Sequence, residues 1–343
     1  MQDLTLERTV DVDAEAALPS ARGPLSARML DLLNDGSVGR HPARVPDDPL
    51  GDDDLHLALG LAYELSYRGL PGVRDDLEWD PAVLGLRRDI EEAFEAGLRH
   101  TIRRESVDPR DVPDRLREIA TPPDADSLSA FIEREATLDQ AREFLMHRSA
   151  YQLKEADPHS WVIPRLDGAS KTAVMEIQYD EYGSGDPAWM HSELFRTMMV
   201  AAGLDGSYGA YLDRLPGPTL ATVNLITLFG VHRRLRGALV GHLAAFEMTS
   251  SLPNRAYARG FRRLGFGDDA VRFFDEHVEA DSVHEVLAGD LAAGLAVEEP
   301  ELASDIVFGA MAMALLEGRF ADGLLRAWRA GETMLLPAGV RSW

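Results

Sequence analysis

The chain has 343 residues, 45% of them hydrophobic, and a formal net charge of −23, which is enough apolar material for a sizeable core in one large domain or two modest ones. The acidic excess repels phosphate backbones and anionic lipid, so binding to nucleic acid or to a membrane surface is not expected. Because the sequence has no cysteine, disulfides, zinc fingers, thiolate-bound iron–sulfur clusters and cysteine nucleophiles are excluded, and His, Asp or Glu must bind any metal.

The first 50 residues are rich in Pro, Gly, Asp and Arg and carry one short apolar cluster, ARMLDLL. This composition predicts a mostly flexible N-terminal arm over residues 1–50. The start of the chain is acidic and has no apolar run typical of a signal peptide, and the best apolar run, about 306–316, is too short to cross a bilayer. We therefore expect a soluble, cytoplasmic protein.

Residues 51–123 are interpreted as an accessory helical region. The apolar spacing at 54–72 is helical and stops at a Pro-Gly turn, and 80–105 opens with an Asp-Pro pair typical of a helix start. Two prolines among acidic and small residues follow at 121–127. They predict a domain boundary, after which residues 124–343 form a second domain.

The second domain is predicted to consist of one helix after another. No stretch of strict alternation over six residues predicts a strand. We therefore expect an all-α protein with a helical bundle from about residue 124 to the end. The expected helices of the bundle span 127–156, 168–183, 186–204, 219–231, 233–250, 254–264, 267–288 and 298–331.

The segment HVEADSVHEV carries His277, Asp281 and His284 at spacing i, i+4, i+7, so on a helix the three side chains share one face. Polar groups on the inward face of a bundle are costly unless they are paired or bound to a metal. Carboxylates and imidazoles from four bundle helices are the ligands of non-haem di-iron sites. Further candidates on other predicted helices are Glu155, Glu181, His191 and Glu247.

Glu181 and His191 are ten positions apart, a spacing that would not place them on one face of an unbroken helix. The intervening GSGDP must interrupt the helix, and this interruption could bring both side chains to one point.

Each candidate also has an ordinary structural explanation. The acidic flank of HVEADSVHEV favours a solvated helix face, and Glu181 beside Asp180 could simply end a helix. Glu155 and Glu247 could form salt bridges, for which the nearby bases are Arg165 and Lys171, and Arg233 and Arg236. Four further histidines lack a matched spacing: His147, His159, His232 and His242. Of these, His242 could pack near Glu247. The joint occurrence on separate helices of one bundle favours a metal site.

Four segments in this order, KEADPHSW, DEYGSGDPAWMHSELF, RRLRGALVGHLAAFEMTSS and HVEADSVHE, resemble haem-oxygenase-like di-iron oxidases and oxygenases. More narrowly, they resemble the bacterial iron-containing redox enzymes over about residues 125–340. The resemblance implies a haem-oxygenase-like seven-helix bundle with an N-terminal helical extension. It also implies two Fe(2+) per chain. The ligands that it implies are Glu155, Glu181, His191, His277, Asp281 and His284, with Glu247 as a further carboxylate. It identifies no catalytic residues beyond these ligands.

The resemblance further implies an O2-dependent di-iron oxidoreductase that oxidises an amine, an amino acid or a fatty acid. It does not select between N-oxygenation, desaturation and C–C cleavage, and it leaves open an external reductant and a homodimer. Two alternatives remain. One is a metal-free protein of the same fold, either a cofactor-independent oxidase or a hydrolase like thiaminase, although the lack of a cysteine nucleophile counts against the latter. The other is a non-enzymatic acidic interaction module.

Overall fold

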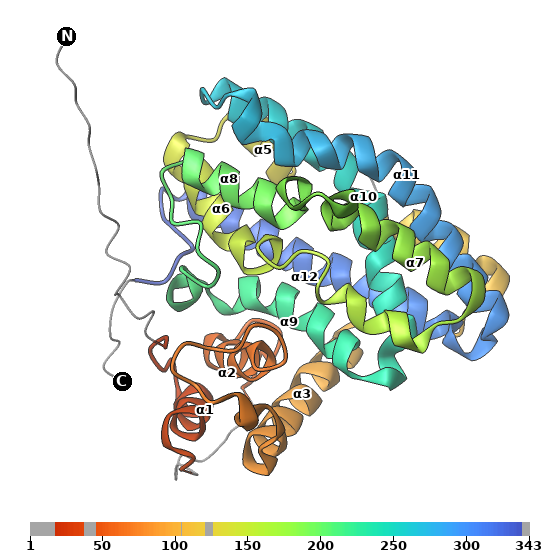
Figure 1. Ribbon diagram of the computed structural model, residues 1–343, viewed down its shortest axis with the longest axis horizontal. Helices are drawn as coiled ribbons and strands as arrows, with labels where there is room; N and C mark the ends of the chain where they lie inside the picture. The colour runs from red at the N-terminus through yellow and green to blue at the C-terminus, as the bar shows by residue number, and fades with distance from the viewer. Residues whose placement is uncertain (1–17, 38–45, 104, 121–125, 338–343) are drawn as a thin grey trace.

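The computed structural model describes residues 18–37, 46–103, 105–120 and 126–337, apart from the side chains of residues 281 and 282. Every regular element in these ranges is helical, which confirms the predicted all-α class (Figure 1). None of the described helices is long and apolar enough to span a membrane. The α-helices are α1 (Pro24–Asp35), α2 (Asp53–Glu64), α3 (Pro81–Thr101), α4 (Val112–Ile119), α5 (Leu128–Arg134), α6 (Leu138–Gln152), α7 (Gly168–Glu181), α8 (His191–Ala201), α9 (Gly217–Val231), α10 (Arg236–Arg263), α11 (Asp268–Glu298) and α12 (Ala303–Arg329).

The short 3-10 helices connect these elements and shape several of the loops. They are η1 (Asp75–Trp79), η2 (Pro109–Asp111), η3 (His159–Arg165), η4 (Gly183–Gly185), η5 (Pro187–Trp189), η6 (Leu212–Arg214), η7 (Arg233–Leu235) and η8 (Pro300–Leu302).

Helix α10 lies at the centre of the bundle and packs along both α11 and α12 (Figure 1). Two glycines allow α10 and α12 to approach at backbone distance. A Cβ atom at Gly241 would lie 1.8 Å from the carbonyl oxygen of Ile306, and one at Gly309 would lie 1.9 Å from that of Ala238. Helices α7 and α8 pack on α11, whereas α9 packs on α12. The polar side chains of α7, α8, α10 and α11 are therefore brought toward one interior.

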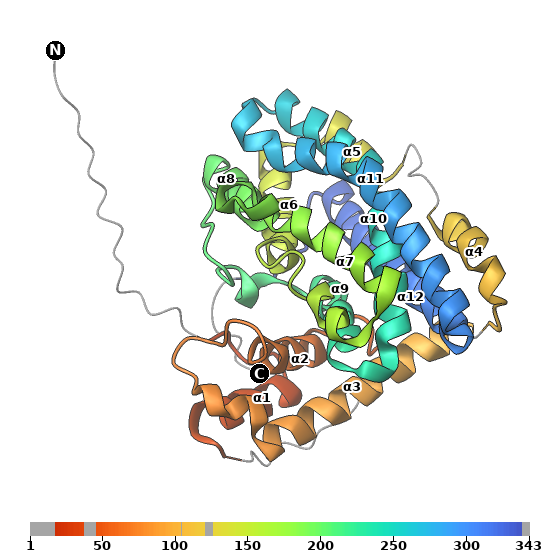
Figure 2. The same cartoon turned by 45° about the vertical axis from the view of Figure 1, so that its right-hand side comes forward.

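Helix α2 packs on α9, and α1 and α3 pack on α2, so the three helices lie below the bundle as drawn in Figure 2. Helix α1 falls in the range predicted to be a mostly flexible arm, yet its apolar stripe of Met29, Leu32 and Leu33 is buried. Asp54 of α2 also accepts hydrogen bonds from the backbone N–H groups of Leu25 and Ser26 at 2.8 and 2.7 Å. These N–H groups in the first turn of α1 have no acceptor within the helix, so Asp54 supplies one.

One apolar cluster joins the N-terminal helices to the bundle, because it contains residues from α1, α2 and α3 as well as from α9, α10 and α12. Of the predicted boundary at 121–127, residues 121–125 lie outside the described residues. The division into 1–50, 51–123 and 124–343 stays a prediction.

The chain divides into helices differently from the prediction at two places; in addition, α11 runs to Glu298 rather than to 288, and α8 begins at His191 rather than at 186. The helix expected over 127–156 is two helices, because Thr137 starts α6 with its own cap: its Oγ1 accepts from Gln140 N at 3.3 Å, and its N donates to Gln140 Oε1 at 2.9 Å. Conversely, the helices expected over 233–250 and 254–264 are one helix, α10, which continues through Pro253.

Candidate metal centre

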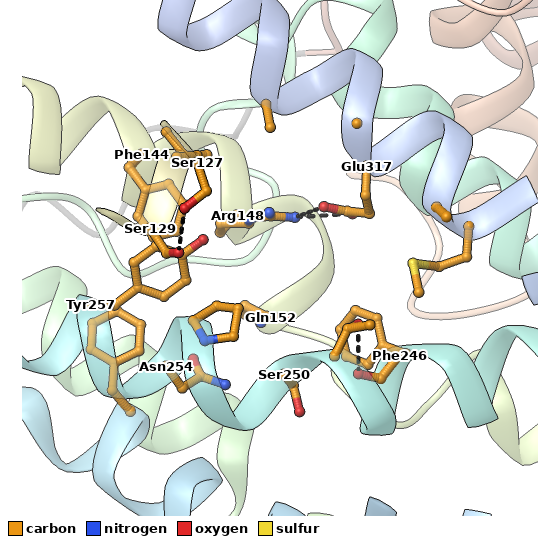
Figure 3. Close-up of a pocket in the computed structure, with 18 of the residues that line it drawn as sticks. Ser127, Ser129, Phe144, Arg148, Gln152, Phe246, Ser250, Asn254, Tyr257 and Glu317 are labelled. Carbon is orange, nitrogen blue, oxygen red and sulfur yellow. Dashed lines mark hydrogen bonds and ion pairs between the residues drawn. The ribbon is translucent and has the colours of Figure 1, made fainter. Parts of the chain in front are cut away.

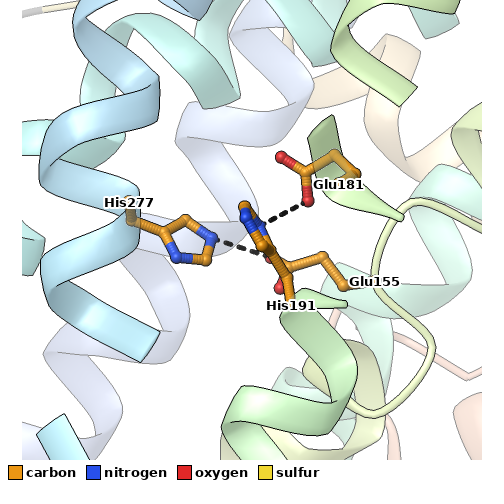
Figure 4. A group of neighbouring side chains, drawn as sticks. All are labelled: Glu155, Glu181, His191 and His277. Carbon is orange, nitrogen blue, oxygen red and sulfur yellow. Dashed lines mark ion pairs between the residues drawn. The ribbon is translucent and has the colours of Figure 1, made fainter. Parts of the chain in front are cut away.

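Six of the seven predicted ligands converge in the interior of the bundle. Glu155, Glu181, His191 and His277 each offer one ligand atom, and these atoms all lie within 4.8 Å of one another (Figure 4). Ligand atoms of Glu181, Glu247 and His284 meet the same limit and form a second group. All six residues are buried. The side chain of the seventh predicted ligand, Asp281, lies outside the described residues.

Glu181 belongs to both groups, and its two oxygens face different histidines. Its Oε2 lies 2.8 Å from His191 Nδ1, whereas its Oε1 lies 3.7 Å from His284 Nδ1. A carboxylate placed in this way can bind two metal ions at once, one through each oxygen.

The turn between α7 and α8 places Glu181 beside His191. Helix α7 ends at Glu181, the backbone then has positive φ at Gly183 (73°) and Ser184 (52°), and α8 begins at His191. A Cβ atom at Gly183 would lie 2.6 Å from Met190 N, so only glycine fits there. The predicted interruption at GSGDP is therefore present, and it joins two side chains that a continuous helix would separate.

Glu155 was expected on a helix but lies in the turn that follows α6. Helix α6 ends at Gln152, a hydrogen bond from Lys154 N to Tyr151 O (2.8 Å) closes the turn, and Ala156 has a φ of 71°. Glu155 Oε1 approaches His277 Nε2 at 3.4 Å. The neighbouring side chain of Lys154 is also buried, but it forms an ion pair with Glu64 on α2. Glu64 therefore has a structural role.

Hydrogen bonds of the backbone and of Asp180 orient two of the imidazole rings. His277 Nδ1 lies 2.7 Å from the carbonyl oxygen of Phe273, which can only accept, so Nδ1 carries the hydrogen and the Nε2 lone pair faces Glu155. His284 Nε2 lies 3.2 Å from Asp180 Oδ2, and its Nδ1 faces Glu247 Oε2 at 3.5 Å. Such contacts to the second ring nitrogen are typical of metal-binding histidines.

The charge balance of the cluster favours a bound cation. Burial raises the pKa of Glu155, Glu181 and Glu247. Burial also acts to lower the pKa of His284, but Glu247, Glu181 and Asp180 outweigh it and raise that pKa to about 9. Glu155 Oε2 and His284 Nδ1 are buried without a hydrogen bond. A proton on His284 partly compensates these carboxylates, and a metal ion would compensate them more fully.

The salt bridges considered as alternatives for Glu155 and Glu247 do not form. Arg165 donates to the carbonyl oxygens of Gly230 and Val231. Lys171 lies 4.0 Å from Asp167, and Arg236 pairs with Glu299.

The other histidines have contacts of their own. His147 Nδ1 lies 2.7 Å from Thr219 Oγ1, and His232 Nε2 lies 2.9 Å from Glu91 Oε2. His242 Nδ1 lies 3.2 Å from His159 Nε2, and burial lowers both pKa values, that of His159 to about 3.

A cavity of about 10 Å³, room for roughly one water molecule, adjoins the cluster. Its walls include Glu155, Glu181, Glu247 and His277, together with Tyr151 and His159. The site thus leaves a small space next to the ligands, which Tyr151 and His159 also line.

A second cavity, of about 370 Å³, shares Phe246 and Ser250 with the small one (Figure 3). Its walls combine aromatic side chains such as Phe246 and Phe273 with polar ones, which include the ion pair of Arg148 and Glu317. Neither this cavity nor the contact of Asp180 is predictable from the sequence, because each depends on helices that are far apart in the chain. The one local signal was an acidic residue in the last turn of α7, where the helix dipole disfavours it.

Comparison with known proteins supports an iron-dependent role for this cluster. A family model described as iron-containing redox enzyme matches residues 142–318, which is more than half of the chain and includes every described residue of the two groups. The curated proteins contain no match to the sequence.

Proposed function

Because the chain belongs to the family of iron-containing redox enzymes, we propose that it is a non-haem di-iron oxidase or oxygenase that uses O2 to oxidise a small organic substrate, an amine, an amino acid or a fatty acid. Family membership supports an oxidoreductase in general. The observation that supports two irons is the position of Glu181, whose carboxylate is shared by both groups of ligand atoms.

The donor atoms suit iron. Each group combines carboxylate oxygens with imidazole nitrogen, a set that binds iron, manganese or zinc well and contains no soft sulfur ligand. Glu155, Glu181, His191 and His277 would hold one ion, and Glu181, Glu247 and His284 the other. Iron bound there would supply the binding and reduction of O2. The protein's own contribution is to orient the imidazoles through Phe273 O and Asp180, and to keep water out of a buried site.

Iron content tests this function most directly. Protein loaded anaerobically with Fe(II) and desalted should contain about two irons per chain, as expected for two complete ligand sets. His277→Ala and His284→Ala should each lose iron from one group, whereas Glu181→Ala should lose iron from both. His100→Ala, at an exposed position on α3, is the matched control and should bind as wild type does.

O2 uptake by the iron-loaded protein, measured with a chemical reductant, should fall in the same three variants and not in the control. Circular dichroism should show that the helices persist, because Ala is the best helix former. A folded wild-type protein that retains no iron would contradict the proposal and favour the metal-free or interaction-module alternatives.

A further inference from the structure

We propose that the cavity of about 370 Å³ binds a free α-amino acid by its charged head group, with the carboxylate at Arg148 and the ammonium at Glu317, so that the far end of the substrate's side chain lies next to the metal centre. This inference rests on the proposed function and selects one of its three substrate classes. It also predicts which part of the substrate is oxidised.

The head-group site consists of two opposite charges held in fixed positions. Arg148 Nη1 lies 3.0 and 2.8 Å from the two carboxylate oxygens of Glu317. The guanidinium also lies over the rings of Phe320 and Phe144, at 4.6 and 5.6 Å from their centroids. The two side chains are nevertheless 22% and 26% exposed, so the pair is accessible from the cavity that it lines (Figure 3).

A zwitterion complements this pair better than a singly charged ligand does. A fatty acid would pair with Arg148 but bring its carboxylate close to Glu317, and a simple amine would pair with Glu317 but lie close to Arg148. Adding an uncompensated charge to this partly buried pair is unfavourable. Because Arg148 and Glu317 already neutralise each other, a zwitterion adds no net charge to the pair, whereas either singly charged ligand does.

Gln152 supplies a second acceptor in the same wall. It follows Arg148 by one turn of α6, and its Oε1 is buried without a hydrogen bond. A buried acceptor without a donor is unfavourable, because it has lost its hydrogen bonds to water. The N–H groups of a bound ammonium would satisfy it.

The direction of the cavity follows from helix α10, which carries residues at both ends of it. Glu247 and Ser250 lie at the metal end, whereas Tyr257 lies near Arg148. Ten residues of helix separate Glu247 from Tyr257, which is about 15 Å at 1.5 Å per residue. A head group beside Arg148 therefore keeps the α-carbon away from the metal ligands.

Apolar side chains line much of the space between the two ends, together with the polar side chains of Thr249 and Asn254 on α10. Phe273 continues from the cavity to the metal centre, because its ring centroid lies 4.3 Å from that of His277. The neighbouring walls are Phe195, Phe246, Phe274 and Met313. A long or aromatic amino-acid side chain fits this lining, and its distal atoms would be the ones exposed to oxidation.

Calorimetric binding to the metal-free protein tests the inference. The probes are L-phenylalanine, L-tryptophan, L-leucine and L-lysine, with 3-phenylpropionate and phenethylamine as the deaminated and decarboxylated forms of phenylalanine, and decanoate as a fatty acid. At least one amino acid should bind, and it should bind at least about tenfold more tightly than its singly charged analogues, the factor expected for about 1.4 kcal/mol.

Charge-removing variants of the pair should change this preference in opposite directions. Glu317→Gln should weaken amino-acid binding about tenfold or more and improve binding of 3-phenylpropionate relative to it, whereas Arg148→Gln should favour phenethylamine. Glu193→Gln and Arg196→Gln, which alter an exposed Glu–Arg pair on α8, are the matched controls and should bind as wild type does. If Arg148→Gln does not fold, the wild-type comparison and the isosteric Glu317→Gln still test the inference.

Two results would overturn the head-group assignment: no amino acid in the panel binds, or decanoate or 3-phenylpropionate binds as tightly as the best amino acid. Because the measurement uses metal-free protein, its result is independent of iron loading. If an amino acid binds but the protein retains no iron in the loading experiment, only the di-iron function is rejected. If the protein retains iron but no amino acid binds, only this inference is rejected.

Discussion

Replacing Asp180 with Asn should weaken iron binding without destabilising the protein. Asp180 lies in the last turn of α7, where a negative charge opposes the helix dipole at a cost of about 0.3–1 kcal/mol. Its Oδ2 contacts His284 Nε2 at 3.2 Å, and its Oδ1 accepts from Ser184 Oγ at 3.0 Å. The residue therefore holds a ligand imidazole at a position that is unfavourable for its own helix.

The expected magnitudes follow from its exposure. The Asp180 side chain is 43% exposed, so its attraction to a protonated His284 in the metal-free protein contributes about 1 kcal/mol or less. Asn removes this attraction and also the repulsion from the helix dipole, so the free energy of unfolding should change by less than about 1 kcal/mol. Losing such an orienting contact typically costs about 10–100-fold in metal affinity. For a partly exposed contact we expect about tenfold, or about 1.4 kcal/mol.

Anaerobic titration with Fe(II) against a competing chelator measures the affinity, and urea unfolding of the metal-free protein measures the stability. Glu176→Gln is the matched control, because it removes the same charge one turn earlier on α7 from an exposed side chain. Wild-type iron affinity in Asp180→Asn, or an equal loss in Glu176→Gln, would refute the orienting role of Asp180.

Three further predictions concern the fold and its pH dependence. Gly241→Ala should lower the free energy of unfolding in urea by about 1–3 kcal/mol or more, because its Cβ would collide with Ile306 O. Gly289→Ala, with no neighbour within 4 Å, should instead raise it by about 0.5–1 kcal/mol. Similar effects of the two substitutions would contradict the close packing of α10 on α12. His159 is 2% exposed and has its pKa lowered to about 3, so its stability contribution is complete above the unfolded pKa of about 6.5 and decreases as pH falls toward 3. In metal-free protein, the free energy of unfolding of wild type should therefore fall more than that of His159→Gln between about pH 7 and about pH 5.5, by about 1 kcal/mol. An equal fall in both proteins would contradict a buried neutral imidazole. Lys154→Met should cost about 3–5 kcal/mol by leaving Glu64 without its buried cation, and a thermal-unfolding midpoint equal to that of wild type would show that the pair is dispensable.

The sequence alone determined the features that depend on near neighbours. Helical spacing predicted the all-α class, and the glycines and proline of GSGDP predicted the end of α7 before His191. The spacing of His277 and His284 predicted one helix face because 3.6 residues make a turn wherever a helix forms. The residue types also predicted the donor set, since a chain without cysteine can bind iron only through nitrogen and oxygen ligands.

Only the tertiary structure decided how these pieces meet. It placed Glu155 in a turn beyond α6, gave Glu181 to both groups of ligand atoms, and brought Asp180 to His284 across 104 positions of sequence. It also closed α6, α10 and α12 around the cavity that contains Arg148 and Glu317. Helical periodicity says which residues share a face, but not which face meets which. Which faces meet depends on how whole helices cross one another, and here the crossing of α10 and α12 is set by close contacts such as that of Gly241 with Ile306. Such long-range packing leaves no periodic signal in the chain.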